Sequence, residues 1–171
     1  MNRRYSCIAG ILICCATSCG RDKFAQELDF EKAAVPLVRE VQDGGYSVIS
    51  TKELYDRVQT GERSWLLIDA MPEDSYSAGH IESAVHFLFP KDTMANWDAA
   101  ETGGKSEADY RALLGDDLAR PIIIYCGYAT CLRSHNAAMW ARRFGYQNVF
   151  RHPGGLFAWK GAGYPLVTKK P

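Results

Sequence analysis

The sequence lacks an excess of either charge. Its 20 lysines and arginines balance 20 aspartates and glutamates, and no basic stripe runs along the chain. A nucleic-acid-binding domain usually carries a basic patch or stripe, so we expect no nucleic-acid partner. Internal repeats and low-complexity tracts are also missing. Hydrophobic residues make up 47% and charged residues 23% of the chain, which is typical of a globular protein and excludes a disordered one.

Cysteine is scarce outside the first twenty residues. Four of the six cysteines lie at positions 7, 14, 15 and 19, which leaves Cys126 and Cys131 for the rest of the chain. This distribution excludes a disulfide-rich scaffold. With 171 residues the chain is also too short for a barrel of eight strand–helix units, which needs about 250 residues. We therefore expect one domain with a leader segment.

The first residues predict a secretory signal. Arg3 and Arg4 precede an apolar run over residues 5–16, which small residues close. The run is too short to span a bilayer. Its ending, Ala-Thr-Ser-Cys, resembles a bacterial lipobox. That resemblance implies that residues 1–18 are removed and that Cys19 is lipidated and becomes the first mature residue. An ordinary signal cleaved nearby and an uncleaved anchor stay open as alternatives.

This interpretation also predicts where the chain works. Arg21, and not Asp, follows Gly20, which by resemblance to Gram-negative lipoproteins favours the periplasmic face of the outer membrane. After the lipidation site, residues 19–45 are predicted to form a polar tether, over 20–29, and a helix, over 30–41. Pro36 should kink or split that helix, because proline removes a helical hydrogen bond.

Residues 46–168 are predicted to form one α/β domain. Strand patterns lie at 46–49, 65–69, 83–89, 121–125 and 149–150, and helical patterns follow Ser50, Pro72, Glu107, Arg133 and Gly155. Such alternation predicts a mostly parallel central sheet with helices on both faces. Ligands of such folds bind beyond the carboxyl ends of the strands, so the segment after Tyr125 is the first candidate site.

The candidate nucleophile is Cys126, which follows the strand that ends at Tyr125. Backbone N–H groups of the loop and the positive end of the next helix should lower the pKa of its thiol. Arg133 adds a fixed positive charge, and Gly127 lets the chain curl around the sulfur. The alternative is a buried cysteine that acts as a small core residue. The predicted substrate-binding loop comprises Gly127, Tyr128, Ala129, Thr130, Cys131, Leu132, Arg133 and Ser134.

Three segments of the chain resemble the rhodanese family, over roughly residues 47–166. The first holds the strand with Asp69 and then Gly79-His80-Ile81, the second holds Cys126 through Ser134, and the third holds Gly154-Gly155 through Trp159. The resemblance implies sulfur transfer, in which a donor such as thiosulfate leaves a persulfide on Cys126 and a thiol or cyanide removes it. It implies no metal and no organic cofactor.

The chain departs from the familiar rhodanese pattern in its active loop. Arg133 lies seven positions beyond Cys126, whereas about five is usual in the family, so thiosulfate is less assured as the donor. A cysteine-dependent phosphatase or arsenate reductase on the same fold is therefore an alternative. A lipid-anchored module that binds a partner without catalysis is another.

The remaining candidates have smaller predicted roles. Cys131 is a candidate resolving or redox thiol, because it lies five positions after Cys126. An idle thiol is one alternative, and Cys131 as the sulfur carrier is another, although Cys126 is the cysteine that follows the strand as the resemblance requires. His135 is a candidate assisting group, although a cap or surface role is more usual. His80 and Asp69 are predicted to be structural. His86 and His152 show no zinc-ligand spacing, so we expect no metal site.

Overall fold

The computed structural model describes residues 22–168. The predicted signal peptide, residues 1–18, and the predicted lipidation site at Cys19 therefore lie outside the described residues. Within the described part of the chain, no helix is both long and apolar enough to cross a membrane.

The domain is built on a five-stranded sheet in the order β1-β5-β4-β2-β3. Each pair of neighbouring strands is parallel, which confirms the predicted α/β class. The strands are β1 (Ser47–Val48), β2 (Leu66–Asp69), β3 (Ala84–His86), β4 (Ile122–Tyr125) and β5 (Val149–His152).

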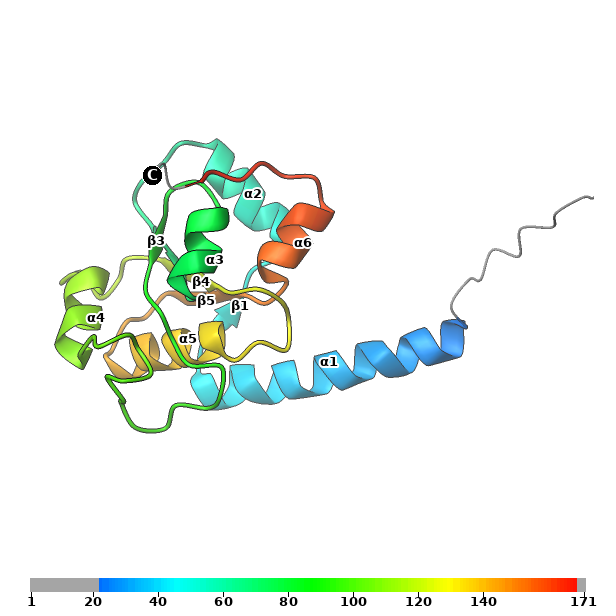
Figure 1. Cartoon of the computed structure of the whole chain (residues 1–171), viewed down its shortest axis with the longest axis horizontal. Coiled ribbons are helices and arrows are strands. Elements are labelled where there is room, and N and C mark those ends of the chain that lie inside the picture. The colour runs from blue at the N-terminus through cyan, green and yellow to red at the C-terminus, as the bar shows by residue number, and fades with distance from the viewer. Residues whose placement is uncertain (1–21, 169–171) are drawn as a thin grey trace, which may run out of the picture.

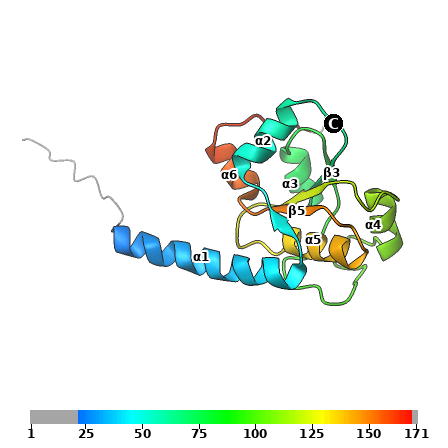
Figure 2. The ribbon, with the colours of Figure 1, turned by 180° about the vertical axis from the view of Figure 1, so that it is seen from behind.

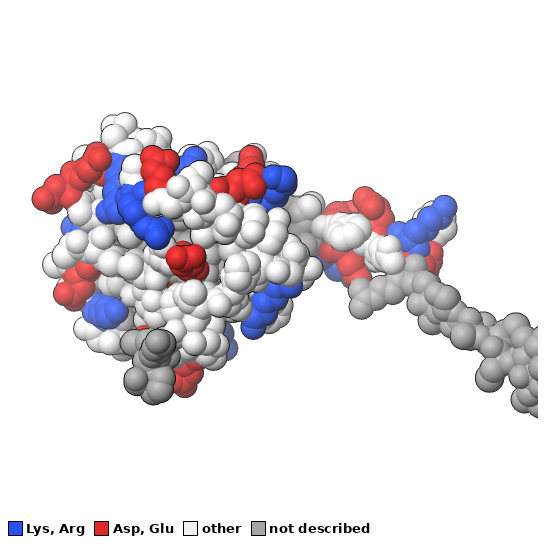
Figure 3. Space-filling view, turned by 90° about the horizontal axis from the view of Figure 1, so that it is seen from above, with Lys and Arg blue, Asp and Glu red and all other residues white. Residues whose placement is uncertain are grey.

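Helices cover both faces of the sheet. They are α1 (Lys23–Gly44), α2 (Thr51–Gln59), α3 (Glu73–Ala78), α4 (Glu107–Leu114), α5 (Arg133–Arg143) and α6 (Gly155–Gly161). Helices α2, α3 and α6 lie on one side of the sheet, and α1, α4 and α5 lie on the other (Figures 1 and 2). On the face shown in Figure 3, acidic and basic side chains are interspersed.

Local sequence signals explain where several helices begin. Ser50 caps α2 with a complete capping box, because its side chain accepts from the Glu53 amide and the Glu53 carboxylate accepts from the Ser50 amide. Ser106 and Asp109 form the same arrangement at the start of α4. The predicted capping box at Ser50 is confirmed.

Helix α1 differs from the prediction in two ways. It begins at Lys23, where a polar tether was expected, because the Asp22 side chain accepts a hydrogen bond from the Phe24 amide and caps the helix. It also continues through Pro36 without splitting. Pro36 and Lys32, whose carbonyl loses its helical donor, are both exposed, so water can satisfy that carbonyl.

The most buried strand leads directly to the candidate site. Residues Ile122, Ile123, Ile124 and Tyr125 of β4 are all 0% exposed, as expected of a parallel strand covered on both faces. The register pairs Ile124 with Arg151 and Tyr125 with His152 on β5. The end of β5 therefore lies beside the loop that follows Tyr125.

Candidate active site at the loop 126–134

The loop from Cys126 to Ser134 connects β4 to α5, and the start of α6 packs against it. The carbonyl groups of Cys126 and Gly127 accept hydrogen bonds from the amides of Leu156 and Phe157, at 2.8 and 2.9 Å. A side chain at Gly155 would prevent this contact, because its Cβ would lie 2.3 Å from the Cys126 carbonyl oxygen. Gly155 also has a φ of 57°, a left-handed conformation that favours glycine.

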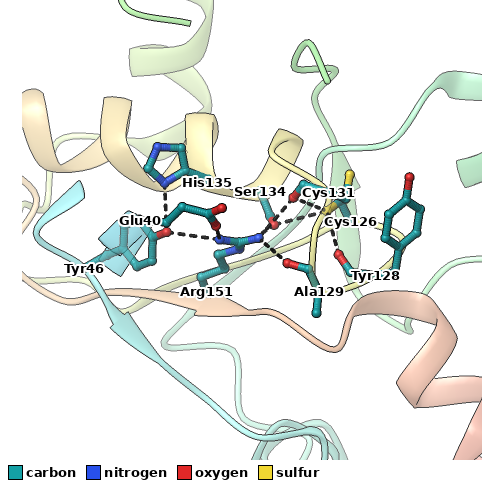
Figure 4. A network of polar contacts seen from close by, with 9 residues as sticks. All are labelled: Glu40, Tyr46, Cys126, Tyr128, Ala129, Cys131, Ser134, His135 and Arg151. Carbon is teal, nitrogen blue, oxygen red and sulfur yellow. Dashed lines mark hydrogen bonds and ion pairs between the residues drawn. The ribbon is translucent and has the colours of Figure 1, made fainter. Parts of the chain in front are cut away.

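Cys126 lies under the loop and is 1% exposed. Its sulfur lies 3.1 Å from the Ser134 hydroxyl and 3.3 Å from the Cys131 carbonyl oxygen, with the Tyr128 carbonyl oxygen at 3.9 Å (Figure 4). Two of these three neighbours are acceptors. The loop thus presents carbonyl groups to Cys126 in addition to an N–H group of the predicted kind, which the Ser134 amide supplies.

The predicted low pKa of Cys126 is wrong for this conformation. Burial raises the pKa of the Cys126 thiol well above its ordinary value, and the neighbouring Cys131 sulfur raises it further. The hydrogen bonds with the Ser134 hydroxyl and the Ser134 amide act in the opposite direction and are the smaller effects. A thiol in an apolar interior stays protonated because the charged form loses its water.

The anion-stabilising groups converge on Cys131 instead. The hydrogen bond from Cys126, the amides of Arg133 and Gly127 and the charge of Arg133 outweigh partial burial and lower the pKa of Cys131 to about 6. Cys131 is half-buried and lies two residues before Arg133, where α5 begins. These groups favour the thiolate of Cys131, in the environment that the sequence assigned to Cys126.

Cys131 also lines an open cavity of about 410 Å³, whereas Cys126 does not. Tyr128 and Phe157 form one side of this cavity, with their ring centres 5.4 Å apart, and they are 48% and 63% exposed. Lys91 and Arg133 supply positive charge to the lining. The Arg133 guanidinium donates to the Phe89 carbonyl, so it is anchored away from the Cys126 sulfur.

A buried arginine lies behind the loop. Arg151 of β5 is 0% exposed and forms an ion pair with Glu40 of α1 (Figure 4). Its Nη2 donates to the carbonyl oxygens of Ala129 and Cys131, both at 3.0 Å, and its Nε donates to the Ser134 hydroxyl at 2.9 Å. One guanidinium therefore holds three points of the loop.

His135 belongs to this buried network and does not contact either sulfur. Its Nδ1 lies 2.9 Å from the Tyr46 hydroxyl, which in turn lies 3.2 Å from Arg151 Nη1. Since Arg151 can only donate, Tyr46 accepts from it and donates its own proton to His135. Burial lowers the pKa of His135, so the ring is neutral at pH 7.

Asp69 and His80, which the sequence predicts to be structural, both contact nearby backbone groups. Asp69 is buried and accepts from the Met71 amide at 2.9 Å, and His80 lies 2.9 Å from the Tyr76 carbonyl oxygen. Among residues 22–168, no cluster of His, Cys, Asp and Glu has the arrangement of a metal site.

Arg151, Glu40 and Tyr46 are the site residues that sequence reasoning missed. The predicted strand covered residues 149–150 and so left out Arg151, which lies in β5. The available signal was a basic residue directly after the apolar pair Val149-Phe150 and close to Gly154-Gly155. Its partner Glu40 is 111 positions away, which no local pattern reveals.

Residues 50–162 match the family model of the rhodanese-like domain, and the chain therefore belongs to that family. An HTH-type transcriptional regulator of Mycobacterium tuberculosis is 34% identical over 123 residues, which cover 72% of this chain and 46% of that protein. The chain thus spans about half the length of this curated relative.

Solved structures with different named activities share the fold. The polysulfide-sulfur transferase homodimer of Wolinella succinogenes has a TM-score of 0.53 at 17% identity, over 84% of this chain and 90% of that chain. A protein of unknown function from Rhodopseudomonas palustris, described as a possible tyrosine phosphatase, has a TM-score of 0.52 at 18% identity, over 77% of this chain and 93% of that chain. Such likeness shows the fold alone, so the reaction must be argued from the site.

Proposed function

We propose that the chain is a sulfurtransferase that takes a sulfane sulfur from a small anionic donor, such as thiosulfate, and passes it to a thiol or cyanide. The observation that carries this proposal is a pair of interacting thiols, of which Cys131 has the lowered pKa and lines a cavity that also holds Lys91 and Arg133. Positive groups favour a sulfur-containing anion, and a thiolate is the attacking form of cysteine.

Cys131 is the thiol that meets the donor in this conformation, because it lines the cavity and Cys126 is buried. Its thiolate attacks the outer sulfur of thiosulfate. A new S–S bond forms on Cys131, the S–S bond of the donor breaks, and its electron pair leaves with sulfite. The anion changes from a thiolate to a persulfide, so charge is conserved.

Cys126 is placed to receive the sulfur next. Its proton passes to the Cys131 persulfide, and its thiolate then attacks the outer sulfur. Cys126 becomes the persulfide that the family resemblance implies, and the Cys131 thiolate is restored. Burial then shields the persulfide from water. Delivery to an acceptor follows the same steps in reverse and ends with attack by the acceptor thiolate on the outer sulfur.

Mass spectrometry of the full-length protein tests this proposal. Thiosulfate should add one sulfur, about 32 Da, to the peptide that holds both cysteines. The double variant Cys126→Ser, Cys131→Ser should gain nothing, and a gain there would overturn the proposal. Loading should slow at least about tenfold in Cys131→Ser and persist in Cys126→Ser. Loading of Cys131→Ser at the wild-type rate would instead assign entry to Cys126, as the sequence alone predicts.

Thiol–disulfide exchange is a second candidate, because the two thiols contact each other. A Cys126–Cys131 bond would form as both thiols lose a proton and an electron to an external disulfide, which is reduced to two thiols. Oxidised glutathione should then remove about 2 Da from the peptide without leaving a glutathione adduct. A persistent mixed disulfide on Cys131 would exclude this candidate.

A phosphatase or arsenate reductase has less support from the geometry. That chemistry needs an arginine fork on the oxyanion, and the Arg133 guanidinium donates to the Phe89 carbonyl instead. If the protein hydrolysed an aryl phosphate faster than it consumed thiosulfate, a phosphatase would be better supported than a sulfurtransferase. A non-catalytic binding module would keep its partner when Cys126 is changed to Ser and would never show a persulfide.

We also propose that the chain is a lipoprotein of the bacterial cell envelope, anchored through Cys19 and facing the periplasm from the outer membrane. The lipobox-like residues before Cys19 support this placement. Labelled fatty acid should be incorporated into the wild type and not into Cys19→Ala. Equal labelling of the two would contradict it.

A further inference from the structure

Helix α1 reaches the back of the loop although it lies outside the family match. The match begins at residue 50, and α1 ends at Gly44. Glu40, in the last turns of α1, forms an ion pair with Arg151. The Arg151 side chain is 0% exposed and that of Glu40 is 16% exposed. A segment that precedes the matched domain therefore supplies the counter-charge for a buried cation beneath the loop (Figure 4).

Arg151 directs its other donors to the loop. Its Nη2 holds the carbonyl groups of Ala129 and Cys131, and its Nε donates to Ser134. A guanidinium has no acceptor, so the Ser134 oxygen accepts there and keeps its own proton for another partner. The neighbour in reach is the Cys126 sulfur, at 3.1 Å. A continuous chain of polar contacts therefore runs from Glu40 through Arg151 and Ser134 to Cys126, and it leaves the Ser134 proton available to the Cys126 sulfur.

The other ionisable groups around Arg151 do not replace Glu40. Tyr46 accepts from Arg151 and stays neutral, because burial is the largest influence on its pKa and raises it. His135 is neutral as well, because burial lowers its pKa. The nearby charge of Asp43 raises that pKa, and the nearby charge of Arg143 lowers it. On the cavity side, Arg133 adds a second positive charge near Cys131. Glu40 is thus the anion that faces the Arg151 guanidinium directly.

We infer that Arg151 and Glu40 are positioning residues for the two thiols. Arg151 fixes the loop carbonyls and turns the Ser134 hydroxyl toward Cys126, while Glu40 occupies the guanidinium so that a thiolate does not become its counter-ion. The inference deepens the proposed sulfur transfer and rests on it, because it makes α1 part of the same site. It assigns to α1 a share in setting the ionisation of Cys131.

The test is the pH dependence of iodoacetamide alkylation at Cys131, measured by peptide mass spectrometry on the full-length protein. In Glu40→Gln the buried cation loses its counter-charge, so a nearby thiolate becomes more favourable. The midpoint of Cys131 should fall by about half a pH unit. In Arg151→Met the Cys131 carbonyl loses its donor and the loop loosens. The midpoint should rise by at least about one unit toward the ordinary cysteine value of about 8.5.

Two controls match these changes in chemistry. Glu31→Gln alters an exposed carboxylate on the same helix. Arg142→Met removes a guanidinium that also holds two carbonyl groups, those of Tyr146 and Gln147, away from the loop. Neither control should move the midpoint.

Opposite shifts in the two variants support the inference. A rise or no change in Glu40→Gln overturns it, because a purely structural role would loosen the loop and raise the midpoint in both variants. If Arg151→Met does not fold, Glu40→Gln still tests the inference. Unfolding would raise the Cys131 midpoint, whereas the inference predicts a lower midpoint in Glu40→Gln. Alkylation needs no sulfur donor. If both variants show the expected shifts but thiosulfate adds no sulfur, the proposed function is overturned and this inference still stands.

Discussion

The two sides of the loop 126–134 differ in almost every physical respect. On the cavity side, Tyr128 and Phe157 are exposed and Cys131 is half-buried. On the opposite side, Cys126 and Arg151 are 1% and 0% exposed and are fully engaged in polar contacts. The comparison teaches that binding and positioning are separated across one short segment. Changes on the cavity side should affect the reaction, and changes on the buried side should affect folding as well.

The largest effect is expected from Arg151→Met. Removal of one partner from a buried ion pair leaves Glu40 and two loop carbonyls without their donor. Such losses typically cost about 3–5 kcal/mol. Urea unfolding of the variant should show a loss in this range, and Arg142→Met should lose less than about 1.5 kcal/mol because its contacts lie nearer the surface. Similar losses in the two variants would remove the distinction between a buried anchor and an ordinary one.

A smaller loss of stability is expected from Gly155→Ala. The new Cβ would meet the Cys126 carbonyl oxygen at 2.3 Å, and the φ of 57° is unfavourable for alanine. We expect a loss of about 3 kcal/mol, seen as a lower urea midpoint.

Gly163→Ala is the matched control, because Gly163 has a φ of 73° and no atom within 4 Å of the added Cβ. It should lose only about 1 kcal/mol, from the backbone conformation alone. Equal losses at the two glycines would mean that α6 can move away from the loop without penalty.

The next effect concerns pH and separates the two cysteines. The pKa of Cys131 is lowered to about 6, so its thiolate accumulates as the pH rises through 6. Alkylation of Cys131 should increase about tenfold from pH 5 to pH 7 and then level off. Cys126 should stay unreactive over this range, because burial raises its pKa.

Cys126→Ala sharpens this comparison. The hydrogen bond from Cys126 is the largest influence that lowers the pKa of Cys131, so its removal should shift the Cys131 midpoint upward. Reaction of Cys126 before Cys131 in the wild type would contradict the assignment of the two environments.

The smallest effect is expected on the cavity side. Phe157 is 63% exposed, so Phe157→Ala should change stability by less than about 0.5 kcal/mol. Loss of an aromatic contact should slow transfer to an aromatic thiol about fivefold and leave transfer to cyanide unchanged. Phe24→Ala, on the exposed part of α1, should change neither rate. An equal loss with cyanide would show that Phe157 acts on the loop and not on the acceptor.

Most of the fold could be predicted because it depends on local signals. The apolar run at 121–125 predicts a buried strand, Ser50 and Glu53 predict a helix start, and the structure contains both. The family resemblance also depends on short motifs whose residues lie close together in the sequence. The match to the family model confirms that resemblance.

The details of the site could not be predicted in the same way. The sequence places Cys126 at the end of a strand, but the direction of the loop carbonyls depends on Arg151, and the position of Arg151 depends on Glu40. These contacts join residues from three distant segments. The assignment of the lower pKa to Cys126 therefore failed, although the physical reasoning applies to Cys131 in the same loop.

The hold of Arg151 on two loop carbonyls has a consequence for descent within the family. If a relative had a shorter loop without the two inward carbonyl groups, a buried guanidinium there would lack acceptors. We expect three features to be inherited together: the long loop, the basic residue of the last strand, and the acidic residue of the helix that precedes the matched domain. Where the loop is shorter, we expect both charged residues to be absent.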